Sequence, residues 1–107
     1  MAGNMGVVVP ERAFLQRLRD LTTELGIVLI FDEVQTGIGR SGALFAYQQY
    51  GVVPDVVTMA KGLGGGVPIG GIIAKDHVAE VFTPGTHAST FGGNPFVNAT
   101  AKYVIET

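Results

Sequence analysis

The stretch PDVVTMAKGLGGGVPIGG, residues 54–71, decides the fold that we expect for this chain. It begins with a turn at Pro54-Asp55, continues as an apolar run over 56–60, and then reaches Lys61 and a cluster of glycines. A short apolar run bounded by turn residues is typical of a strand buried inside a sheet. The sequence therefore predicts a strand that ends at a lysine, although lysines normally lie on solvated surfaces.

Helical and extended segments alternate on both sides of this stretch. The residues from 11 to 25 predict a helix that ends at Gly26, because apolar side chains recur there at helical spacing, at Phe14, Leu18, Leu21 and Leu25. The apolar run 27–31 predicts a parallel strand that is buried on both faces and ends at Asp32. Four further elements are expected: a short helix at 43–50, a strand at 71–74, a short helix at 76–82, and a helix that begins at Asn94-Pro95. This order predicts an α/β fold with a mostly parallel sheet flanked by helices, and no domain boundary within 1–107.

Composition excludes several classes of function. The chain has 107 residues, a net charge of −2 and no cysteine. The charge argues against binding to nucleic acid or to an anionic membrane, and the lack of cysteine excludes disulfides and thiolate metal sites. We assign no metal ligands. No apolar stretch approaches the length of a membrane span and the first residues do not resemble a leader, so we expect a cytoplasmic protein.

The two predicted parallel strands both end in groups that can carry chemistry. Asp32 and Glu33 follow the first strand, and Lys61 follows the second. Ligands of open α/β sheets bind beyond the carboxyl ends of the strands, so we expect acid and amine to face one crevice. A lysine desolvated at the mouth of an apolar strand favours its neutral form, which makes it a candidate nucleophile. Taken singly, Asp32 also fits a turn cap and Lys61 an ordinary surface lysine.

A second glycine pattern supports a different hypothesis. Residues 37–42 fit G-x-G-x-x-G, the pattern of dinucleotide-binding oxidoreductases. The match is weak, because the pattern does not follow a strand directly and has no acidic residue at the expected distance. Lys61 precedes its glycines, whereas the lysine of a nucleotide-binding P-loop follows them, so a P-loop is not expected.

Three motifs together resemble one enzyme family. LIFDEVQTGIGRSG (29–42), PDVVTMAKGLGGGVPIGG (54–71) and HASTFGGNP (87–95) are similar, in order and spacing, to the successive signatures of the class III aminotransferases. These enzymes depend on pyridoxal 5'-phosphate. The resemblance implies that residues 1–107 are a central segment of the large, cofactor-binding domain of fold type I, the aspartate aminotransferase-like fold.

The resemblance also implies a role for five residues. Lys61 would bind the cofactor aldehyde covalently and carry the proton during amino transfer. Asp32 would pair with the ring nitrogen, Val34 would pack on a ring face, and Gln35 would bond near the ring hydroxyl. Thr90 would reach the cofactor phosphate of the neighbouring subunit of a homodimer. Three other motif residues, Glu33, Arg40 and His87, are expected to have supporting roles.

The sequence FTPGTHASTFGGNP (82–95) is most similar to the corresponding segment of acetylornithine aminotransferases. This implies transfer of an amino group between N-acetylornithine and 2-oxoglutarate, in arginine biosynthesis. The alternatives are another ω-amine transaminase, of the ornithine, 4-aminobutyrate or putrescine type, or a catalytically inactive fragment. Two residues depart from the family pattern: Asn4 stands where many members carry a gating glutamate, and Ala88 stands where glycine is usual.

Overall fold

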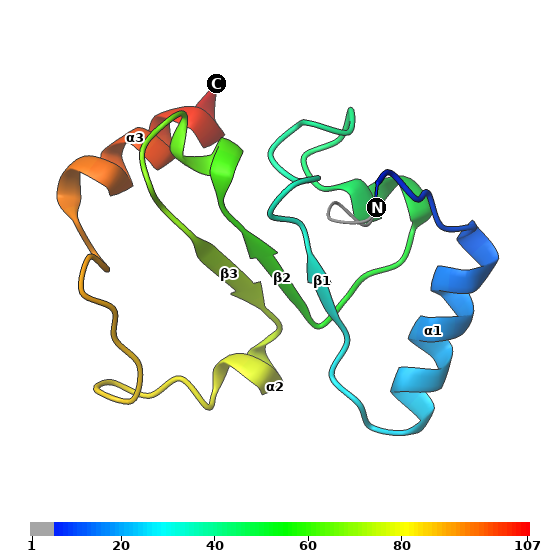
Figure 1. Cartoon of the computed structure of the whole chain (residues 1–107). Helices are drawn as coiled ribbons and strands as arrows, with labels where there is room; N and C mark the ends of the chain where they lie inside the picture. The colour runs from blue at the N-terminus through cyan, green and yellow to red at the C-terminus, as the bar shows by residue number, and fades with distance from the viewer. Residues whose placement is uncertain (1–5) are drawn as a thin grey trace.

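The computed structural model describes residues 6–107, so the departure at Asn4 lies outside the described residues. Three strands form one sheet in the order β1-β2-β3: β1 (Ile30–Asp32), β2 (Val56–Met59) and β3 (Gly71–Ala74). β1 pairs with β2 in parallel, with Ile30 opposite Val56, whereas β3 is antiparallel to β2 (Figure 1). The parallel pair predicted around 54–71 is therefore present, and it is the pair that delivers Asp32 and Lys61.

Five helices accompany the sheet within residues 6–107, and all but the one that begins at Lys61 were predicted. The long ones are α1 (Arg12–Glu24) and α3 (Pro95–Glu106), and between them lie η1 (Ala46–Tyr50), η2 (Lys61–Gly64) and α2 (Asp76–Ala79). α3 begins where expected, because the Asn94 side chain accepts hydrogen bonds from the N–H groups of Phe96 and Val97. The helix expected at 43–50 is a 3-10 turn that starts later, and the one expected at 76–82 is a single turn.

β1 is shorter and more exposed than the sequence predicted. The expected strand at 27–31 was to be buried on both faces, but Ile30 is 56% exposed and Ile27 is 52% exposed. Only Leu29 in this run is buried, at 7%. The prediction of two buried faces was wrong for this chain, because α1 lies beside the sheet and the helices of residues 6–107 leave one face of β1 uncovered (Figure 1).

The core lies between the other face of the sheet and the elements that follow its carboxyl edge. Val57 and Met59 of β2 pack there with three buried partners, Phe45, Leu63 and Ala101. Because Leu63 belongs to η2 and Ala101 to α3, this core holds the turn after Lys61 against the last helix. Packing thus fixes the backbone on which the candidate lysine stands.

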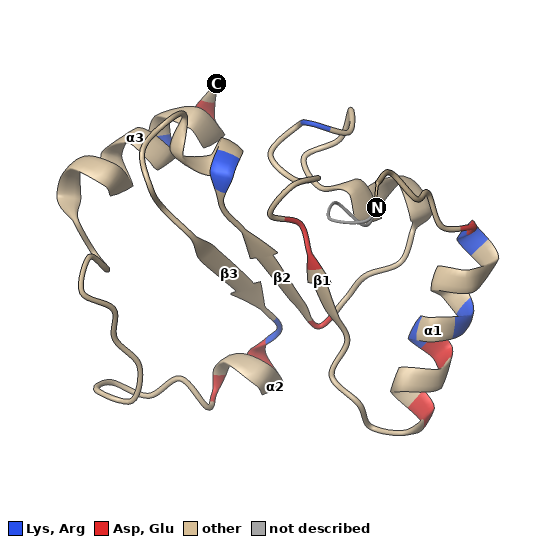
Figure 2. Cartoon of the chain, viewed as in Figure 1, with Lys and Arg blue, Asp and Glu red and all other residues tan. Residues whose placement is uncertain are grey.

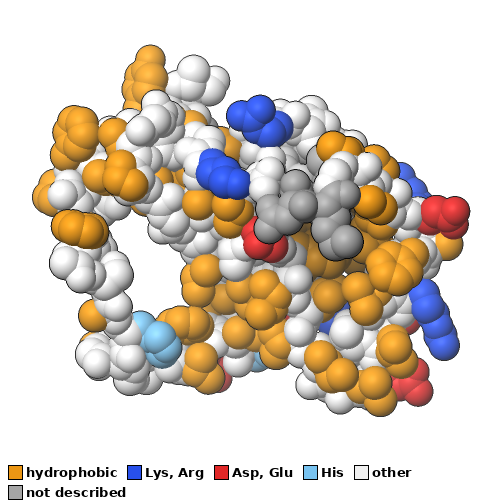
Figure 3. All heavy atoms as spheres, viewed as in Figure 1, with side chains coloured by type: hydrophobic (Ala, Val, Ile, Leu, Met, Phe, Trp, Pro, Cys, Tyr) orange, Lys and Arg blue, Asp and Glu red, His pale blue; other side chains and the backbone are white. Residues whose placement is uncertain are grey.

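Other apolar side chains remain exposed. Phe14 of α1 is 60% exposed, Ile73 of β3 is 53% exposed, and Phe96 of α3 is 69% exposed. Figure 3 shows such side chains spread across the visible face of the molecule. No helix within residues 6–107 has the length and apolar character needed to span a membrane.

A buried carboxylate ties the amino edge of the parallel pair together. Asp55 Oδ2 accepts hydrogen bonds from Leu29 N at 2.9 Å and from Arg19 Nη1 at 2.8 Å, and Oδ1 accepts one from Lys75 Nζ at 2.9 Å. Burial alone raises the pKa of Asp55, but the bonds from Leu29, Arg19 and Lys75 outweigh it and hold the pKa far below its ordinary value. The ionised carboxylate therefore joins α1, β1 and the end of β3.

We expect Asp55→Asn to lower the free energy of unfolding at neutral pH by about 3 kcal/mol, because two cations then lose their buried partner. The folded pKa lies below the unfolded one, so this stabilisation is present above the unfolded value of 3.8 and is lost as the pH falls through it toward the folded pKa. Urea unfolding at several pH values measures both effects, and the variant should show a flatter acid dependence.

The control is the exposed pair of Lys102 and Glu106, whose charged atoms lie 3.7 Å apart. Glu106→Gln should cost less than about 1 kcal/mol, because surface pairs are screened by water. Equal losses in the two variants would contradict the role assigned to Asp55.

Candidate active site

The sheet register brings the predicted acid and amine to one edge. Asp32 is the last residue of β1 and lies opposite Thr58 of β2. Thr58 precedes Lys61 by three residues. Because the two strands are parallel, both side chains emerge at the carboxyl edge. Figure 2 shows the acidic end of β1 and the basic start of η2 at this same edge. The predicted juxtaposition of acid and amine is therefore a feature of the fold.

The Asp32 carboxylate is held in place while remaining exposed. Its Oδ1 accepts hydrogen bonds from Val34 N at 3.0 Å and from Thr58 Oγ1 at 3.2 Å. Both of these hydrogen bonds end on Oδ1. Within residues 6–107, Oδ2 accepts no hydrogen bond. Such a carboxylate is fixed in orientation and can still accept a hydrogen bond from a bound molecule.

Glu33, the second acid at the end of β1, is buried, whereas its neighbour Asp32 is exposed. It is 4% exposed and accepts hydrogen bonds from Ala46 N at 3.2 Å, from Tyr47 N at 2.9 Å, and from the Thr36 hydroxyl. Adjacent residues at a strand end point to opposite faces, so one of two neighbouring acids must turn inward. Glu33 thus closes the loop between β1 and η1, in agreement with the supporting role expected for it.

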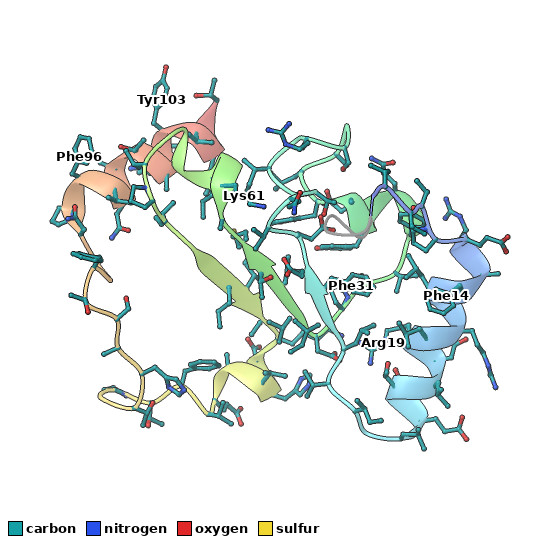
Figure 4. All side chains as sticks on the ribbon, in the orientation of Figure 1. Phe14, Arg19, Phe31, Lys61, Phe96 and Tyr103 are labelled. Carbon is teal, nitrogen blue, oxygen red and sulfur yellow. The ribbon has the colours of Figure 1, made fainter. Side chains whose placement is uncertain are left out.

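Lys61 has an unusual backbone. Its φ of 45° lies in the left-handed region that non-glycine residues rarely adopt. Strained residues of this kind cluster at functional sites, where packing holds them in place. Figure 4 shows the Lys61 side chain projecting from η2 on the side of the loop that follows β1. The side chain is exposed, so the desolvation predicted for it is not present within this chain.

The glycines after Lys61 serve packing within the chain. A Cβ on Gly64 would lie 3.1 Å from Ile69 Cγ2, and one on Gly65 would lie 3.0 Å from Val104 Cγ2. Gly65 also has a φ of 58°, which suits glycine. At positions 64 and 65 these glycines let η2 approach Ile69, in the loop before β3, and α3.

The loop after β1 carries the other two candidates from the first motif. Val34 is half-buried and its N–H donates to Asp32, whereas Gln35 is exposed. The following segment, 37–42, forms irregular turns and does not open an α-helix. The dinucleotide fingerprint requires a helix at that point, because the N-terminus of the helix binds the pyrophosphate. Residues 37–42 therefore do not support the oxidoreductase hypothesis.

Thr90 lies apart from Asp32 and Lys61. It belongs to the exposed segment 83–94, which runs from α2 to α3 along the side of the molecule away from α1 (Figure 1). In the same segment His87 packs on Phe82, with ring centroids 4.6 Å apart, and its Nδ1 lies 2.8 Å from Thr86 Oγ1. Four of the five predicted site residues, Asp32, Val34, Gln35 and Lys61, therefore follow the carboxyl ends of β1 and β2, and Thr90 lies on another segment.

Sequence reasoning missed Thr58, which contacts Asp32 directly. The signal was a lone hydroxyl in the strand VVTM, opposite the acid in a parallel register. The described residues 6–107 contain no group of three or more histidine, aspartate or glutamate side chains arranged to hold a metal ion.

Comparison with known proteins places these features in a family. The model of the family "Aminotransferase class-III" matches residues 1–107. The chain is 57% identical over 103 residues to the succinylornithine transaminase of Photorhabdus laumondii, covering 96% of this chain and 26% of that protein. It is 57% identical over 107 residues to the acetylornithine aminotransferase of Thermosynechococcus vestitus, covering 100% of this chain and 26% of that protein.

A solved structure shares the fold. The ornithine delta-aminotransferase of Plasmodium falciparum superposes with a TM-score of 0.89 at 41% sequence identity, over 95% of this chain and 27% of that one. The α/β arrangement of residues 6–107 is thus that of a segment of an aminotransferase. The chain spans about a quarter of the length of the relatives it matches.

Proposed function

The chain belongs to the class III aminotransferases, and from this premise we propose that it is the central segment of a pyridoxal-phosphate-dependent transaminase. The observation that carries the proposal is that an oriented carboxylate, Asp32, and the exposed amine of Lys61 both lie at the carboxyl edge of two parallel strands. The activity belongs to the whole protein, of which we take residues 1–107 to be one part.

The donor set fits the chemistry of this cofactor. An aldehyde requires a primary amine, which Lys61 offers without a competing ion pair among the described residues. A protonated ring nitrogen requires an anionic acceptor of fixed direction, and Asp32 has that form. When bound, pyridoxal phosphate supplies an electron sink for the carbanion that forms at the amino-bearing carbon.

Each of the four candidate residues at this edge then has a defined role. Lys61 holds the cofactor and, once released, moves a proton to and from the reacting carbon as a general base and acid. Asp32 keeps the ring nitrogen protonated through a charge-assisted hydrogen bond. We assign Val34 to a face of the ring and Gln35 to its hydroxyl, both from the loop that follows Asp32.

We propose an N-acylated ornithine as the amino donor, N-acetylornithine first, with 2-oxoglutarate as acceptor. Relatives named for acetylornithine and succinylornithine support this choice. The structural likeness to an ornithine aminotransferase keeps ornithine as the alternative. We assign the reaction to arginine biosynthesis in the cytoplasm, which a growth requirement for arginine in a strain lacking the gene would support.

Two titrations of the full-length protein test the proposed function. Pyridoxal phosphate should bind and acquire a shifted absorption, and NAD should not bind. Rates with acetylornithine, succinylornithine, ornithine and 4-aminobutyrate then rank the donors. A protein that binds NAD and leaves pyridoxal phosphate free would overturn the proposal, and a protein that binds neither would favour the inactive-fragment alternative.

We further propose a homodimer in which Thr90 of one subunit serves the site of the other. The support is the exposed position of Thr90, away from the edge that holds Lys61, together with the resemblance of motif 87–95 to a family segment that contacts phosphate across subunits. A hydroxyl with neighbouring backbone N–H groups suits a phosphate.

Mixed dimers distinguish a shared site from a separate one. Lys61→Ala and Thr90→Asp homodimers should each be nearly inactive, the second because its new carboxylate repels the phosphate. In a mixed dimer of the two variants, one site carries both lesions and the other carries none. Activity should therefore return to one site in two. If both residues act within the same chain, every site keeps one lesion, and verified heterodimers without recovered activity would exclude sharing.

A further inference from the structure

Thr58 is the only polar residue of β2, and its hydroxyl meets the acid of the neighbouring strand. Thr58 Oγ1 lies 3.2 Å from Asp32 Oδ1, and the ionised carboxylate can only accept, so the hydroxyl donates. The distance is slightly beyond the usual range of about 2.5–3.0 Å for O–H···O hydrogen bonds, so the bond is a weak one. The other three residues of the strand are Val56, Val57 and Met59, and all of them are buried.

Backbone bonds fix this contact from both sides. Asp32 and Thr58 are register partners in the parallel pair, and Glu33 N donates to Thr58 O at 2.9 Å. The carboxylate also accepts from Val34 N at 3.0 Å. Two donors of different origin, one from the loop and one from β2, therefore converge on a single carboxylate oxygen.

We propose that Thr58 is a positioning residue for Asp32. Its hydroxyl and the Val34 N–H together hold Oδ1, so that Oδ2 would remain free to accept a hydrogen bond from the ring nitrogen of the cofactor. This inference rests on the proposed function, since it assigns Thr58 a task only where Asp32 has one. Thr58 lies on the strand that delivers Lys61, so the same bond also ties the acid to the strand of the amine.

A purely structural reason for the threonine is weaker. Valine has the same shape, forms strands as readily, and already occupies two of the four positions of β2. A half-buried hydroxyl adds nothing to the packing, and its desolvation is offset only by a hydrogen bond. The bond to Asp32 is the one that this hydroxyl makes within residues 6–107.

Three variants of the full-length protein test the role. Thr58→Val removes the hydroxyl and keeps the shape, whereas Thr58→Ser keeps the hydroxyl and removes the methyl group. Thr100→Val makes the same chemical change at a threonine whose hydroxyl bonds to Phe96 O within α3. The readouts are the circular dichroism induced in the bound cofactor, its dissociation constant, and kcat and KM for amino transfer. Unfolding of the cofactor-free proteins controls for stability.

In Thr58→Val we expect an altered induced dichroism, a kcat lower by roughly 5-fold, and an unchanged KM, because Asp32 loses one long hydrogen bond and Oδ1 is then held by the Val34 N–H alone. Thr58→Ser and Thr100→Val should match the unaltered protein. If packing were the reason for Thr58, the serine variant would be impaired and the valine variant would not, and the proposal would be overturned. It is equally overturned if all three variants keep the dichroism and kcat of the unaltered protein. Failure of the unaltered protein to bind pyridoxal phosphate would instead remove the proposed function.

Discussion

Replacing Lys61 with alanine is expected to reduce amino transfer in the full-length protein by at least about a thousand-fold. The reason is that one side chain supplies both the covalent attachment and the proton transfer, and proton transfer by a positioned side chain alone contributes 10²–10⁴-fold. The measurement is the single-turnover rate with excess amino donor. An added small amine such as methylamine should restore part of the rate, because the protein around position 61 remains folded.

Peptide mapping identifies the attachment directly. Borohydride reduction of the loaded protein should leave the pyridoxyl group on Lys61. Lys102→Ala is the matched control, since its exposed ammonium lies on α3 in a surface pair, and it should keep normal activity. A label on Lys75 or Lys102 would contradict the assignment.

The second large effect is expected for Asp32→Asn. The amide oxygen can still accept the hydrogen bonds from Val34 and Thr58, so the geometry of the strand end is kept while the charge is removed. Loss of a hydrogen bond to a charged group costs about 1.5–3 kcal/mol, which corresponds to roughly 10- to 100-fold in rate. The weaker electron sink slows proton transfer further, so we expect a loss of orders of magnitude.

Measuring cofactor attachment distinguishes a catalytic role of Asp32 from a purely structural one. In Asp32→Asn, borohydride should still fix the cofactor on Lys61, because the amine is unaffected, while the single-turnover rate falls. Asp20→Asn is the control: it makes the same change on α1, where Asp20 bonds to Gln16 at 3.2 Å, and should be silent. Near-normal turnover in Asp32→Asn would refute the proposed pairing with the ring nitrogen.

Local chemistry made most elements predictable. Helix 11–25 follows from apolar spacing and a terminal glycine, and the structure has α1 at Arg12–Glu24. The strand at 71–74 and the helix start at Asn94-Pro95 were confirmed, because an apolar run and an asparagine cap act within a few residues. The extent of β1 was not predictable, since a strand lasts only as long as its neighbour offers backbone partners, and β2 pairs with three of its residues.

The sequence by itself determined the family to which this chain belongs. An acid after one strand, a lysine after the next, and the motifs around them indicated the family, and the match of the family model to residues 1–107 agreed. These features lie in short stretches of sequence, so the family can be identified without knowing the tertiary structure.

The tertiary structure decided how these groups are oriented and buried. Only the parallel register pairs Asp32 with Thr58, only burial turns Glu33 inward onto η1, and only packing behind η2 holds Lys61 at a φ of 45°. The physical reason is that orientation and burial depend on contacts between segments far apart in the chain. Asp55 shows the same principle, because a residue read as part of a turn becomes the buried ionic partner of Arg19 and Lys75.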